Sequence, residues 1–152
     1  MQISERIEGH VRDAFGAVIS RDGDAMVEAL KGLTAEDSAT AVGLALYVVG
    51  FVVNDIHRDG ATDEELATLA RQITETESDW VQLNPDTVAS LLGAASTGDT
   101  LLGGVAREDL AGNVFVSAGH LLGAFSGQGQ PWHEYLDEIW TALEAEPEPS
   151  SS

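Results

Sequence analysis

Residues 41–53, AVGLALYVVGFVV, form the longest uninterrupted apolar run in the chain. Because the run is apolar on every face, it is typical of a buried helix or a buried strand, and not of an amphipathic surface element. Thr34 precedes it as a candidate helix N-cap, and Gly60 follows it as a stop signal. We therefore predict one helix over 35–58. A buried strand over 47–53 is the alternative, because those residues are mostly β-branched or aromatic.

The same run is short for a membrane span. It holds 13 residues, or 15 if Ala39 and Thr40 are included. A spanning helix needs about 18 or more apolar residues. Buried in a core, such a helix needs neighbours on all sides. We therefore expect no membrane association, and a domain that is packed around this segment.

Apolar periodicity predicts six more helices in the rest of the chain. They are expected at 3–20, 24–33, 62–77, 85–95, 108–125 and 132–144. Asp24 and Asn84 are candidate N-caps, and Pro85 stands at a first helical position, where its missing N–H is harmless. Thr62 has capping-box spacing to Glu65. These capping signals agree with the apolar periodicity, so two independent patterns predict most of the helix starts.

The predicted fold is an all-α bundle of six or seven helices wrapped around two largely apolar central helices. The central helices are 35–58 and 107–125. A chain of 152 residues is in the size range of one domain. We expect a single helical domain over 1–144 and a disordered tail, rich in acid, proline and serine, over 145–152. The order of helix types repeats over 24–77 and 85–144, which suggests two weakly related three-helix halves.

Glycines occur seven residues apart in both central helices. The pairs are Gly43 with Gly50, and Gly112 with Gly119. Seven residues are two helical turns, so each pair shares a face on which another backbone can approach closely. This pattern predicts that the two helices cross each other or a symmetry mate, as in a homodimer. Drift in a glycine-rich composition is the alternative explanation.

The charge is strongly negative and unevenly distributed. The chain has 26 acidic and 7 basic residues, a net charge of −19, and residues 72–152 carry 13 acids against the single base Arg107. Nucleic acids and anionic membranes require a basic surface, so we expect direct binding to neither. The acid excess has two explanations: a solubility or salt-adapted composition, or a surface that meets a basic partner. With no cysteine and no visible signal peptide, we expect a cytoplasmic protein.

No catalytic or metal-binding motif in the sequence is complete. The nucleophile elbow, the phosphate-binding glycine loop and the dinucleotide fingerprint are all missing, so we expect no enzyme activity and no cofactor. His133 and Glu134 begin a pattern like HExxH, but Asp137 stands where the second histidine belongs, which leaves at most a weak metal site. His120 lies in an apolar helix and is predicted to be buried and bonded to a backbone carbonyl or to Tyr47. A ligand pocket or a pH-sensitive interface at His120 is the alternative.

The most suggestive surfaces combine tryptophan with carboxylates. The candidate partner-binding residues form two groups, first Glu75, Glu77, Asp79 and Trp80, and second Trp132, His133, Glu134, Asp137 and Glu138. An aromatic anchor ringed by carboxylates suits the capture of an arginine- or lysine-rich segment. Each tryptophan would serve equally as core material, which is the structural alternative.

These observations favour a non-enzymatic acidic binding protein of the inhibitor, immunity or adaptor kind, which recognises a basic protein or peptide. The second hypothesis is a helical pocket for a small apolar ligand, near His120 or Tyr47. The third is a weak metal-dependent enzyme. The acidic binding protein predicts binding that depends steeply on salt. The pocket predicts an enclosed cavity, and the metal-dependent enzyme predicts measurable metal affinity.

Overall fold

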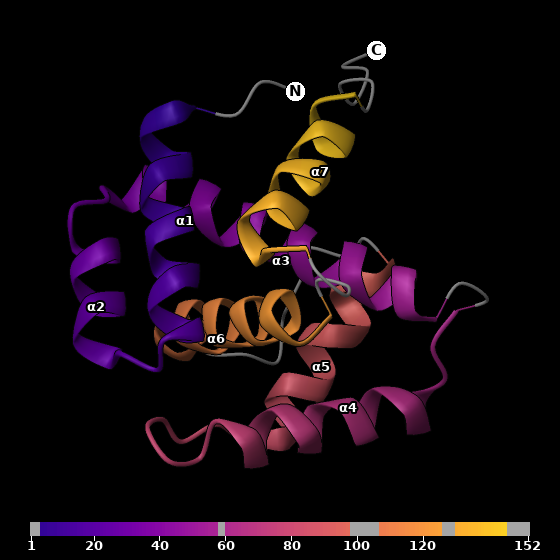
Figure 1. The fold of residues 1–152 in the computed structure, drawn as a ribbon. Helices are drawn as coiled ribbons and strands as arrows, with labels where there is room; N and C mark the ends of the chain where they lie inside the picture. The colour runs from indigo at the N-terminus through magenta and orange to yellow at the C-terminus, as the bar shows by residue number, and fades with distance from the viewer. Residues whose placement is uncertain (1–3, 58–59, 98–106, 126–129, 146–152) are drawn as a thin grey trace.

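The computed structural model describes residues 4–57, 60–97, 107–125 and 130–145. Within these ranges the chain forms helices and no strands (Figure 1). The helices are α1 (Glu5–Ile19), α2 (Gly23–Lys31), α3 (Ala35–Ile56), α4 (Asp63–Thr76), α5 (Pro85–Thr97), α6 (Arg107–Phe125) and α7 (Trp132–Ala145). The predicted all-α bundle is therefore confirmed, and the strand alternative for 47–53 is wrong because those residues lie inside α3. Residues 146–152 of the predicted tail lie outside the described residues.

The helices begin where side chains satisfy their first backbone N–H groups. The Thr34 hydroxyl accepts from the Asp37 N–H at 3.1 Å, and Thr62 forms the predicted capping box with Glu65. The Asn84 side chain accepts from the Asp86 N–H at 2.9 Å at the start of α5. Three predicted caps are thus confirmed.

The predicted cap of α2 is wrong by two residues. Asp22, and not Asp24, accepts from the Ala25 N–H, at 3.0 Å. Asp22 has the extended backbone of an N-cap, and the helix already begins at Gly23; Arg21, just before this cap, has a positive φ of 56°. Asp24 then falls in the first turn of α2, where the helix dipole favours an acid.

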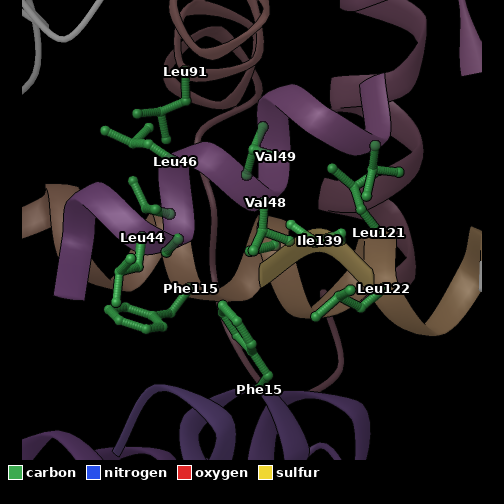
Figure 2. Packing of buried hydrophobic residues seen from close by; sticks show 14 of the residues in the cluster. Phe15, Leu44, Leu46, Val48, Val49, Leu91, Phe115, Leu121, Leu122 and Ile139 are labelled. Carbon is green, nitrogen blue, oxygen red and sulfur yellow. The ribbon is translucent and has the colours of Figure 1, made fainter. Parts of the chain in front are cut away.

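The core lies between α3, α5 and α6, and helices far apart in sequence pack side by side there (Figure 1). α3 packs on α5 and α6, α4 packs on α5, and α1 packs on both α2 and α6. Figure 2 shows Val48 of α3 among side chains of other helices, including Leu122 and Ile139. The rings of Phe15 and Phe115 join α1 to α6, with centroids 5.7 Å apart. The main contacts therefore connect the two proposed halves, which are not separate packing units.

The central helix α3 is not covered on all sides, contrary to the prediction. Val48, Val49 and Val52 are fully buried, but Gly43 is exposed and Tyr47 is half-buried. Among the described residues, one helix, Glu36–Ile56, is long and apolar enough to cross a membrane, and half of its most apolar window is buried inside the protein. The core helix of a soluble protein passes the same test. The whole helix is therefore long enough to cross a membrane, although its uninterrupted apolar run of 13 residues is too short.

The glycines of the central helices do mark close approaches, but with other neighbours than predicted. A Cβ built on Gly50 would lie 2.4 Å from the Ala95 carbonyl oxygen, so α3 meets the backbone of α5 there. A Cβ on Gly119 would lie 2.6 Å from a methyl carbon of Val18 in α1. Gly43 and Gly112 have no such neighbour within 4 Å among the described residues. α3 and α6 do pack on each other, but the glycine pairs do not mark that contact, because Gly50 faces α5 and Gly119 faces α1. The alternative of a contact with a symmetry mate stays a prediction.

Candidate functional site

The two predicted partner-binding groups lie on different parts of the molecule. The first group lies at the end of α4 and in the turn that follows it, and the second lies on the first half of α7. In Figure 1 α4 lies at the bottom of the fold, whereas α7 begins near the middle of the view and runs toward the top. The two groups therefore do not form one continuous site.

The first group does not form the exposed acidic surface that its sequence suggested. Glu75 and Asp79 are exposed, but Glu77 is only 3% exposed. The reason is helical spacing, because Glu77 follows Ile73 by four residues and continues the buried stripe of α4. Trp80 is half-buried beside it. Glu77 is therefore removed from the predicted partner-binding residues and belongs to the interior.

Glu77 is the centre of a buried polar cluster that joins three parts of the chain. Its Oε1 accepts from Trp80 Nε1 at 3.1 Å and lies 3.8 Å from the Arg21 guanidinium. Its Oε2 lies 3.3 Å from Nδ1 of His120, whose side chain is 12% exposed. A buried carboxylate is costly unless it is hydrogen-bonded and paired, and both conditions are met here. The cluster thus ties the end of α4 to α6 and to the turn between α1 and α2.

His120 has a partner that the sequence did not suggest. We expected a backbone carbonyl or Tyr47, and the structure places Glu77 there instead. If Nδ1 carries the proton, it donates to Glu77 and leaves Nε2 as an acceptor. Ser117 precedes His120 by one turn on the same helix, and its hydroxyl has no hydrogen-bond partner among the described residues. Ser117 is fully buried, however, so a substrate does not reach that hydroxyl in this conformation.

The second group remains on the surface. The side chains of His133, Glu134, Asp137 and Glu138 are exposed. Trp132 is half-buried at the start of α7 and covers Gly16 of α1, where a built Cβ would lie 3.4 Å from the indole. Trp132 therefore acts partly as core material, while the carboxylates that follow it face solvent.

Two of these carboxylates are already engaged within the chain. Asp137 Oδ1 accepts from Arg12 Nη2 at 2.6 Å, and the same guanidinium binds Glu8 at 2.6 Å. Glu138 accepts from the Gln130 amide at 2.9 Å. The predicted weak metal site at His133 and Asp137 would have to compete with Arg12. No group of three potential metal ligands occurs in the part of the chain that the structure describes.

The positive charges of the described residues are largely held in internal ion pairs. Arg6 contacts Asp37 at 2.6 Å, Lys31 lies 4.0 Å from Glu28, and Arg12 and Arg21 are paired as described above. The pKa of Asp37 is lowered, chiefly by the hydrogen bond from Arg6. Few bases are therefore left to offset the acidic residues on the surface.

No protein-family model, curated protein or solved structure shows a significant match to this chain.

Proposed function

We propose that this chain is a non-enzymatic binding protein of the inhibitor, immunity or adaptor kind, whose acidic surface recognises a basic protein partner. The observation that carries the proposal is the solvent face of α7. Its exposed carboxylates are Glu134, Asp137, Glu138 and Glu144. No lysine or arginine occurs in this helix. The solvent face of α7 therefore presents a concentrated negative potential to a basic partner.

The internal ion pairs strengthen this argument. Arg12 neutralises part of Asp137, but the other three carboxylates of the α7 face have no ion pair with a base in the described residues. Exposed charges act over a Debye length of about 8 Å at physiological ionic strength, so neighbouring carboxylates on one helix act together on an approaching partner. Such fields mainly accelerate association and fix orientation.

The test compares two variants with equal changes in net charge. The first is Glu134→Gln/Glu138→Gln/Glu144→Gln on α7. The control is Glu5→Gln/Glu36→Gln/Glu64→Gln, which removes three exposed carboxylates from α1, α3 and α4. Fluorescence anisotropy with a labelled octa-arginine peptide, as a basic probe, gives the affinity from 50 to 500 mM salt.

We expect wild-type affinity to fall steeply with salt, and the α7 variant to bind more weakly than the control at low salt. Equal weakening in both variants would show that the total charge matters and the α7 face does not. Affinity that stays flat over the salt range would contradict the proposal as a whole.

A further inference from the structure

Three aromatic rings from distant parts of the sequence gather where α7 crosses α3. Tyr47 and Phe51 lie one turn apart on α3 with ring centroids 6.4 Å apart. Tyr135 of α7 completes the set, with its ring centroid 6.2 Å from that of Phe51 in an edge-on arrangement. We call these three side chains the aromatic patch.

The aromatic patch reaches the surface beside a carboxylate. Tyr47 and Phe51 are half-buried, whereas Tyr135 is 5% exposed and forms the base of the patch. Asp55 follows Phe51 by one turn on the same face of α3 and is exposed. Its Oδ2 accepts from the Tyr135 hydroxyl at 3.1 Å. One turn before Tyr47, Gly43 is exposed and has no neighbour within 4 Å of a built Cβ.

The patch is also continuous with the acidic face of α7. Burial raises the pKa of Tyr135, and the charges of Asp55 and then Glu138 raise it further. The Tyr135 hydroxyl therefore stays protonated and remains a donor to Asp55. Glu138, a member of the α7 face, follows Tyr135 by three residues and so lies on the same side of α7 as its ring.

An aromatic surface bordered by carboxylates attracts a cation in two ways. The negative ring faces attract the charge, and the carboxylate oxygens accept its N–H groups. A guanidinium suits both, because it is planar, stacks on aromatic rings and donates from a rigid fork. An ammonium is more strongly hydrated and stacks less well, and a quaternary ammonium has no N–H to offer to Asp55.

We infer that the aromatic patch, together with Asp55, receives an arginine side chain of the basic partner. This inference rests on the proposed function, because it names the contact by which the acidic surface selects its partner. The carboxylates of α7 then draw the partner in, and the patch distinguishes arginine from lysine.

The experiment measures two peptides of equal charge, octa-arginine and octa-lysine, by fluorescence anisotropy at one low salt concentration. The variants are Tyr47→Leu and Phe51→Leu, which keep apolar bulk but remove the ring. Asp55→Asn is compared with Glu64→Gln, which removes one exposed carboxylate from α4. Thermal unfolding of each variant checks that the fold is kept.

We expect each leucine variant to bind octa-arginine about two- to fivefold more weakly, the range that one exposed cation–π contact gives. Octa-lysine should bind more weakly than octa-arginine to the wild type and change less in the leucine variants. Asp55→Asn should reduce octa-arginine affinity more than Glu64→Gln does.

Three results would overturn the inference, and they are distinguishable. If octa-arginine binds with steep salt dependence but both leucine variants bind as the wild type does, the patch is only packing material and the proposed function stands. Equal losses for both peptides would likewise remove arginine selection while leaving acidic recognition. If wild type binds neither peptide at low salt, the proposed function fails, and the inference fails with it.

Discussion

Replacing Gly50 by alanine tests whether α3 and α5 are packed backbone to backbone. The new Cβ would lie 2.4 Å from the Ala95 carbonyl oxygen, whereas ordinary van der Waals contact begins at 3.4 Å, so the two helices must separate by roughly 1 Å. Overpacking of this kind costs about 1–3 kcal/mol. Alanine stabilises a helix by about 1 kcal/mol relative to glycine, which offsets part of this cost. The expected net effect is a loss of about 0–2 kcal/mol of unfolding free energy.

Gly43→Ala is the matched control in the same helix. Gly43 is exposed and has nothing within 4 Å of a built Cβ, so only the propensity gain of about 1 kcal/mol remains. The unfolding free energy of Gly50→Ala should therefore be about 1–3 kcal/mol lower than that of Gly43→Ala. Urea unfolding followed by far-UV circular dichroism measures both free energies. If Gly50→Ala is as stable as Gly43→Ala, the close approach of α3 and α5 does not exist.

Three further predictions concern packing, the buried carboxylate and pH. Gly119→Ala should be about 1–3 kcal/mol less stable than Gly112→Ala in urea unfolding, because its Cβ would meet Val18; equal stability would contradict the α1–α6 contact. Glu77→Ala should lose about 1–3 kcal/mol by leaving buried donors unpartnered, whereas Glu75→Ala should stay within about 0.5 kcal/mol; similar losses would place Glu77 at the surface. The pKa of Glu65 is lowered from its ordinary 4.5, first by the hydrogen bond from the Thr62 backbone. The ionised Glu65 side chain therefore stabilises the fold above about pH 4.5, and this stabilisation is lost as the pH falls through the lowered pKa. Unfolding free energies measured from pH 6 to 2.5 should therefore fall less in Glu65→Gln than in wild type, and parallel curves would refute this.

Much of the fold is predictable from local signals in the sequence. Thr34, Thr62 and Asn84 are read correctly as caps because capping depends on residues within one turn. The cap at Asp24 is wrong because Asp22 and Asp24 are both favourable cap residues, and the structure uses Asp22. Helix boundaries thus follow from local chemistry, except where two neighbouring residues can both serve as the cap.

The candidate site is less predictable, because it depends on which helices meet. The burial of Glu77 could be predicted from the sequence, because its position continues the apolar spacing of α4. Its partner His120 was not, because a contact between residues 43 positions apart needs the tertiary arrangement. The same holds for the aromatic patch: the spacing of Tyr47, Phe51 and Asp55 is local, but Tyr135 arrives from another helix.

The central structural claim is that α3 is the buried axis of the fold. Native-state hydrogen exchange of individual amides tests it most directly, with α2 as an internal reference because no residue of α2 is buried and Val27 is 59% exposed. We predict that the amides of residues 44–53 exchange most slowly, at the rate of global unfolding, while those of α2 exchange through local opening. Exchange of residues 44–53 as fast as that of α2 would contradict the account.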